Sequence, residues 1–188
     1  MCWYRMEKTI LRAVVAVAFT ASLLSCHSSN TPATQKEMFV DLPHFFEEEV
    51  QRLTTENPEI QKTVTKDSIS ETKTLRVDNW KNELSSFASV DLNKSAYLGY
   101  LEKDSTTRKV TFRSTNPKID LSSVELTYGS GGELQTIVVH RTIKNSLYET
   151  KEVLRYIKDS TYSLEKNQSV LLMNDKYYQI EGTLIATK

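Results

Sequence analysis

Few residues in this chain are of a type that could do chemistry, and they are scattered. Beyond residue 38 the only histidines are His44 and His140, and histidine is the commonest general base near neutral pH. His44 stands before a run of glutamates, which could together bind a metal but equally suit the solvated first turn of a helix. Strand alternation places His140 on the opposite face from Val139 and Arg141, so we expect a surface or lining position. Neither histidine predicts a catalytic or metal site.

The candidate nucleophiles and carboxylates also lack a constellation. Ser130 belongs to the run Gly129–Gly132, which lacks the Gly-x-Ser-x-Gly pattern of a nucleophile turn and is typical of a hairpin. Glycoside hydrolysis would need two carboxylates held on opposite sides of a cleft, and nothing in the sequence holds two of the glutamates in this way. The candidate glutamates are Glu47, Glu48, Glu49 and Glu56. The aspartates adjoin turn-forming residues without the spacing of a calcium loop; they are Asp67, Asp104, Asp120, Asp159 and Asp175. We therefore predict no catalytic residue, no metal ligand and no cofactor, and expect a protein that is not an enzyme.

Aromatic residues carry the only positive hint of binding. A curved sheet lined by them could hold an apolar or sugar-like ligand. Core packing and cross-strand pairing is the alternative that we favour for each one, so the ligand-binding residues stay unassigned. The residues concerned are Trp80, Tyr97, Tyr100, Phe112, Tyr128, Tyr148, Tyr156, Tyr162, Tyr177 and Tyr178.

The first 25 residues have the profile of an exported leader. Arg5, Lys8 and Arg12 precede an apolar, uncharged run over residues 13–24. This run is too short to cross a hydrocarbon core, which needs roughly 20 residues of helix. Small residues surround the end of the run and a polar stretch follows it, as in a secretory signal peptide. The sequence predicts a signal peptide over residues 1–25.

The end of this leader, Leu23-Leu24-Ser25-Cys26, resembles the lipobox of bacterial lipoprotein precursors. The resemblance implies cleavage between Ser25 and Cys26, a diacylglycerol on the Cys26 thiol and an acyl chain on the new amino group. Several acyl chains, at about 0.8 kcal/mol per buried methylene, anchor a protein stably on a membrane. By the same resemblance His27, which is not acidic, favours the outer membrane, facing the periplasm. The alternative is that Cys26 is an ordinary residue near the end of a secretory peptide.

Charge and cysteine content exclude some functions. The chain has 24 basic and 24 acidic residues, and loss of the leader leaves it close to neutral. A nucleic-acid partner would need a basic face, so none is expected. Cys2 lies in the leader, so the mature chain has no second cysteine for a disulfide.

The lipobox resemblance implies a lipidated cysteine at position 26, and the polar composition of the residues up to 38 predicts a flexible tether. A single α+β domain is expected over 39–188. Helical spacing indicates a helix over 42–56 with Asp41 as its N-cap, and a second helix from Trp80 to about Val90 with Asp78 as its N-cap. A hairpin lies between them over residues 60–77. Strands are then expected over 97–103, 108–115, 124–128, 134–142, 148–157, 160–165, 170–173 and 177–185. The expected fold has two N-terminal helices packed on a curved antiparallel β-meander, forming a half-barrel or an open sheet. Two separate domains, over 39–92 and 95–188, are the alternative.

Two segments, Tyr162–Gln168 and Tyr178–Gly182, resemble those of small uncharacterised lipoproteins of Bacteroidota. That resemblance implies a class and no activity. We expect a membrane-anchored, non-enzymatic binding or accessory protein for an apolar ligand or an envelope protein partner. The alternatives are a lipid carrier of half-barrel type, a scaffold without a ligand, and a hydrolase whose residues are not apparent. A filled core with one exposed apolar patch would favour a partner, and an apolar cavity would favour a ligand.

Overall fold

The computed structural model describes residues 39–185. The predictions that concern the signal peptide, Ser25, Cys26 and the tether up to residue 38 lie outside these residues. No helix within 39–185 combines the length and apolar character needed to cross a membrane.

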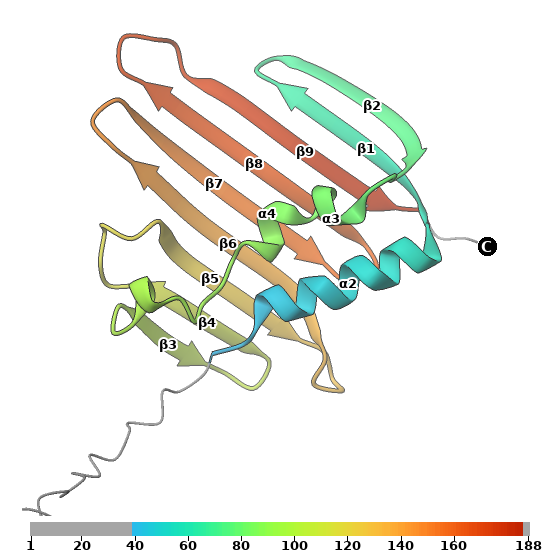
Figure 1. The fold of residues 1–188 in the computed structure, drawn as a ribbon, viewed down its shortest axis with the longest axis horizontal. Helices are drawn as coiled ribbons and strands as arrows, with labels where there is room; N and C mark the ends of the chain where they lie inside the picture. The colour runs from blue at the N-terminus through green and yellow to red at the C-terminus, as the bar shows by residue number, and fades with distance from the viewer. Residues whose placement is uncertain (1–38, 186–188) are drawn as a thin grey trace, which may run out of the picture. The chain divides into compact units, whose positions relative to one another are not determined.

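The described chain is built around one nine-stranded sheet in which every neighbouring pair is antiparallel. The strand order is β2-β1-β9-β8-β7-β6-β5-β4-β3, so β2 and β3 are the two edges and the sheet is open (Figure 1). The strands are β1 (Glu59–Lys66), β2 (Ile69–Arg76), β3 (Leu101–Ser105), β4 (Lys109–Ser114), β5 (Leu121–Tyr128), β6 (Leu134–Lys144), β7 (Tyr148–Ile157), β8 (Thr161–Val170) and β9 (Lys176–Leu184).

This architecture corrects the expected fold class. Instead of two N-terminal helices on a β-meander, the chain is mainly a large antiparallel sheet with little helix. The hairpin β1–β2 precedes the second helical region in the chain, yet it joins the sheet through β9. Ile60 of β1 pairs with Leu184, and Lys66 pairs with Tyr178. Residues 39–92 and 95–185 therefore contribute to the same sheet.

The helix α2 (Leu42–Glu56) has the bounds expected from its periodicity. The Asp41 carboxylate accepts a hydrogen bond from the backbone N–H of His44 at 3.0 Å, which makes Asp41 the N-cap. Asn57 ends the helix in the left-handed conformation at φ 44°, and its N–H donates to the Leu53 carbonyl. Local capping chemistry thus sets both ends of this helix.

The second predicted helix, from Trp80 to about Val90, is wrong as a single element. It is replaced by two four-residue helices, α3 (Trp80–Glu83) and α4 (Ser85–Ala88), which Leu84 separates. The N-cap of α3 is Asn79 rather than Asp78. The Ser85 hydroxyl donates to the Asn82 carbonyl at 2.8 Å, and such local bonds compete with a continuous helix.

Several predicted strands also differ from the structure. The segment expected over 160–165 is the first part of β8, which continues to Val170. The strand expected over 170–173 is wrong, because residues 171–173 form a turn in which the Met173 N–H donates to the Val170 carbonyl. The strand expected over 97–103 is β3, which begins only at Leu101, because Tyr97 lies in the short 3₁₀ helix η2 (Ser95–Tyr97).

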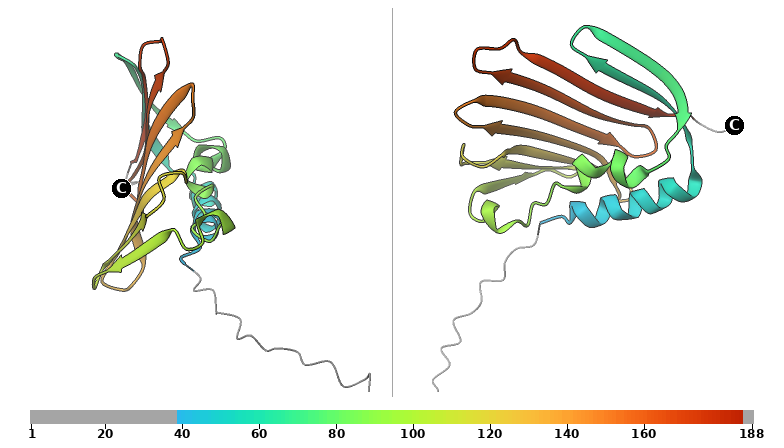
Figure 2. Two further views of the ribbon diagram at one scale, coloured as in Figure 1. Left: turned by 90° about the vertical axis from the view of Figure 1, so that its left-hand side faces the viewer. Right: turned by 45° about the horizontal axis from the view of Figure 1, so that its top comes forward.

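All helices lie on one face of the sheet, as the edge-on view shows (Figure 2). The core fills the space between this face and the helices, with Phe46 packing edge-to-face on Tyr156 at 5.2 Å between ring centroids. Gly182 of β9 is needed here, since a Cβ atom would collide with the ring of Tyr162. The most buried members of the core include Leu42, Phe46, Leu53, Ile60, Trp80, Leu84, Phe87, Phe112, Val124, Leu126, Ile137, Leu154, Tyr156 and Tyr162.

Candidate functional site

The helices cover only part of their face of the sheet. In Figure 1 α2 lies over the end of the sheet from which β9 leaves toward the C-terminus, and the turns β1–β2, β6–β7 and β8–β9 extend beyond α2 at the other end. Hydrogen bonds join these three turns to one another or to the strand beside them. The Leu171 N–H donates to the Leu147 carbonyl at 2.9 Å, and the Asp67 N–H donates to the Tyr177 carbonyl at 2.8 Å.

These turns carry most of the large apolar side chains that are strongly exposed. Ile69 is 76% exposed, Leu147 65%, Leu171 66%, Leu172 97% and Met173 59%. We call these five residues the apolar end. Single exposed apolar side chains are normal on a protein surface, but a cluster of them is typical of an interaction site.

The backbone at the tip of the β8–β9 turn is unusual. Leu172 has a φ of 64°, in the left-handed region that β-carbon sterics disfavour for leucine. The turn is closed by the Met173 N–H, which donates to the Val170 carbonyl at 3.0 Å. A nearly fully exposed leucine is therefore held in a conformation that glycine or asparagine would adopt at lower cost.

Three lysines adjoin the apolar end on the helix-bearing face. In the sheet register Lys66 pairs with Tyr178, and Tyr178 pairs with Lys166. Lys176 lies two residues before Tyr178 on β9, and so on the same face. We call Lys66, Lys166 and Lys176 the lysine row. Together with Asp67, Gln168, Tyr177 and Tyr178 they line a depression of about 140 Å³.

Charges in the lysine row are only partly neutralised. The Lys166 ammonium lies 2.8 Å from a carboxylate oxygen of Glu152. The Asp67 carboxylate accepts a hydrogen bond from the Tyr177 N–H at 3.0 Å. Three lysines against Asp67 and Glu152 leave this face with one net positive charge beside the exposed apolar side chains. Asp175, also in the β8–β9 turn, lines a different depression with Glu149 and Lys151.

A second charged cluster lies under α2. Glu49 is only 3% exposed, although it stands in a run of three glutamates that is typical of a solvated helix turn. Arg52 donates to it at 2.7 Å and also to Glu56 at 2.7 Å, and the Tyr156 hydroxyl donates to Glu49 as well. Burial opposes ionisation of Glu49, but the hydrogen bonds from Arg52 and Tyr156 prevail and lower its pKa. Burial and the bond to Glu49 raise the pKa of Tyr156.

A third cluster joins η2, the residue that precedes β5, and β6. Asp120 accepts from Arg141 at 2.7 Å and from the Tyr97 hydroxyl at 2.7 Å. Burial raises the pKa of Asp120, but these two bonds outweigh it, so its pKa lies below the ordinary value. Within each cluster the charged and polar groups hydrogen-bond to one another and connect separate elements. This arrangement is typical of groups that stabilise the fold.

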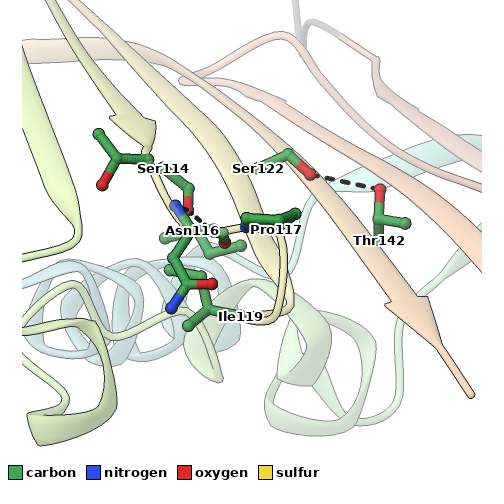
Figure 3. Close-up of a pocket in the computed structure, with 8 residues that line it drawn as sticks. Ser114, Asn116, Pro117, Ile119, Ser122 and Thr142 are labelled. Carbon is green, nitrogen blue, oxygen red and sulfur yellow. Dashed lines mark hydrogen bonds between the residues drawn. The ribbon is translucent and has the colours of Figure 1, made fainter.

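The pocket in Figure 3 lies between the β4–β5 connection and β6 and has a volume of about 320 Å³. Ser122 and Thr142 hydrogen-bond across it at 3.3 Å, and the Ser114 hydroxyl accepts from the Asn116 N–H at 3.1 Å. None of the described residues that line it carries a titratable side chain, so it offers no acid or base. The lining consists of Ser114, Thr115, Asn116, Pro117, Ile119, Leu121, Ser122 and Thr142.

The structure does not bring the candidate chemical residues together. His44 is exposed in the first turn of α2, where its ring lies 3.5 Å from the Glu48 carboxylate. His140 is exposed on the helix-free face of the sheet, while Val139 and Arg141 lie on the other face, as strand alternation predicts. Within residues 39–185 no group of three or more His, Cys, Asp or Glu side chains could hold a metal ion. Half of the aromatic candidates are buried in the core; these are Trp80, Tyr97, Phe112, Tyr156 and Tyr162.

Sequence reasoning missed the buried carboxylate and the apolar end. The helical phase did contain a signal for Glu49, which lies three residues after Phe46 and four before Leu53, on the buried face of α2. No comparable signal marked the apolar end, because strand pairing decides which turns are neighbours.

No protein-family model, curated protein or solved structure matches this chain. Its function is therefore inferred from its own residues and their geometry.

Proposed function

We propose that this chain is a membrane-anchored lipoprotein of the cell envelope that acts as a non-enzymatic binding or accessory protein. Its anchor would be the lipidated Cys26, at the end of a leader that resembles a lipoprotein signal peptide. The outer membrane, facing the periplasm, is the proposed location.

The observation that supports a binding role is the combination of a filled core with one exposed apolar cluster. The aromatic side chains beneath α2 contact one another and occupy the space where a carrier would hold its ligand. The sheet is open, with edges at β2 and β3, so it encloses no barrel interior. The apolar end therefore supports binding at the surface rather than inside the fold.

The anchor can be tested in cells with the full chain. Wild-type protein, Cys26→Ser and Cys2→Ser are expressed in a diderm bacterium that is fed an alkyne analogue of palmitate. We expect label on the wild type and on Cys2→Ser, because Cys2 would be removed with the leader, and none on Cys26→Ser. Label that persists on Cys26→Ser, or is absent from the wild type, would contradict the proposal.

A further inference from the structure

We infer that the apolar end inserts into the surface of an anionic phospholipid bilayer, with the lysine row against the lipid headgroups. This inference deepens the proposed function by naming the surface to which the anchored domain binds. It depends on the shape, backbone and charge of one end of the sheet.

The shape of the apolar end suits a lipid surface. Its side chains come from three separate turns that extend past α2 (Figure 1). Leu172, at 97% exposed, stands at a tip. A bilayer interface adapts to such protruding side chains, whereas a protein partner would need a matching cavity for each turn.

The backbone of the turns also fits this environment. Polar backbone groups are costly in a lipid phase unless they bond internally. The Leu171 N–H donates to Leu147 of the β6–β7 turn, and the Met173 N–H donates to Val170 within the β8–β9 turn. The left-handed Leu172 is a local conformational cost, and such costs are concentrated at functional sites. The leucine at this position supplies an apolar side chain where glycine would supply none.

Charge complementarity favours a bilayer with anionic headgroups. Lys66 and Lys176 are exposed beside the apolar side chains. Lys166 forms an ion pair with Glu152. Each basic residue near an anionic surface contributes about 1 kcal/mol, which is roughly a fivefold change in occupancy. Apolar tips bordered by lysines are the composition expected of an interfacial binding surface.

The proposed anchor is within reach of the same membrane. Residues 27–38 separate Cys26 from Phe39, and a fully extended chain of that length spans at most about 40 Å. Phe39 packs on Phe112 of β4, which lies four strands from β8 and so about 19 Å from it across the sheet. A ten-residue strand such as β8 is about 33 Å long, so the apolar end lies within about 38 Å of Phe39. The thiol of Cys26 and the apolar end can therefore lie in one bilayer.

The test uses the full chain in vesicles of phosphatidylethanolamine and phosphatidylglycerol. Cys2 and Cys26 are replaced by serine, so that an environment-sensitive fluorophore attaches only to the thiol introduced by Leu172→Cys. The matched control is Ser130→Cys in the same background, in the β5–β6 turn at the opposite end of the sheet. We expect a blue shift and quenching by brominated lipids at position 172 and neither at position 130. Replacing Lys66 and Lys176 by glutamine, or the anionic lipid by phosphatidylcholine, should reduce the quenched fraction; Lys81→Gln should not.

The outcomes separate this inference from the proposed function. Equal, solvent-like emission at both positions overturns insertion, even when the mass of the wild-type protein shows lipid on Cys26. A blue shift at position 172 without quenching by brominated lipids places the residue against protein and also overturns it. Absence of lipid on Cys26 contradicts the proposed anchor, while quenching at position 172 would still support insertion.

Discussion

The buried carboxylate of Glu49 offers a sharp test of how α2 is held on the sheet. Arg52 is its main cationic partner and is itself 26% exposed, while the Lys158 ammonium lies farther away at 3.5 Å. Replacing Arg52 by methionine keeps most of the apolar side chain and removes the charge. Glu49 is then left as a buried anion that only Tyr156 and Lys158 still contact.

Loss of one partner from a fully buried ion pair costs about 3–5 kcal/mol. Arg52 is partly exposed and Lys158 remains, so we expect Arg52→Met to lower the free energy of unfolding by about 2 kcal/mol at pH 7. In a domain of this size that corresponds to a fall in melting temperature of roughly 4–8 °C. Urea unfolding followed by circular dichroism measures the change directly.

The pH dependence has a definite sign. The folded-state pKa of Glu49 is below its ordinary value of 4.5, so its ion pair stabilises the fold above that pH. The contribution is lost as the pH falls through the lowered folded-state pKa. The difference between wild type and Arg52→Met should therefore be full at pH 7 and shrink under acid conditions.

Two further variants make the test specific. Arg155→Met removes an exposed arginine from the helix-free face and should change stability by less than about 0.5 kcal/mol. Glu49→Gln combined with Arg52→Met removes the buried charge and keeps an acceptor for Tyr156, so it should recover part of the loss. If Arg52→Met costs no more than Arg155→Met, or its cost is independent of pH, the assigned role of this cluster is wrong.

Three other predictions concern the core and the Asp120 cluster. Gly182→Ala should destabilise the fold by about 1–3 kcal/mol in urea unfolding, because the added methyl meets the buried Tyr162 ring; wild-type stability would contradict this contact. Phe46→Ala should cost about 3–5 kcal/mol by the same measurement, since Phe46 is 1% exposed, and a loss below 1 kcal/mol would show that the site is not packed as described. Asp120→Asn should lower the melting temperature at pH 7, and the difference from the wild type should shrink only as the pH falls below 3.8 and through the lowered folded-state pKa of Asp120; a constant difference would refute the pairing with Arg141.

Several local features were predictable because nearby residues determine them. The helix over 42–56 follows from its apolar spacing and from Asp41, which caps its first turn. The glycine-rich run 129–132 marked the β5–β6 hairpin, and Gly132 indeed adopts a φ of 85°. The region from Trp80 to Val90 misled the prediction, because its serines bond to nearby carbonyl groups and interrupt the helix.

By itself, the sequence determined the local elements: a capped helix, strands of alternating character and the turns between many of them, since these depend on neighbours a few residues apart. Only the tertiary structure decided that β1 pairs with β9 and that α2 buries Glu49 against Tyr156, 107 positions along the chain. The same long-range pairing brings the turns at Asp67, Leu147 and Leu171 to one end of the sheet. Pairing between distant strands depends on the register and burial of the whole sheet, and no local pattern encodes it.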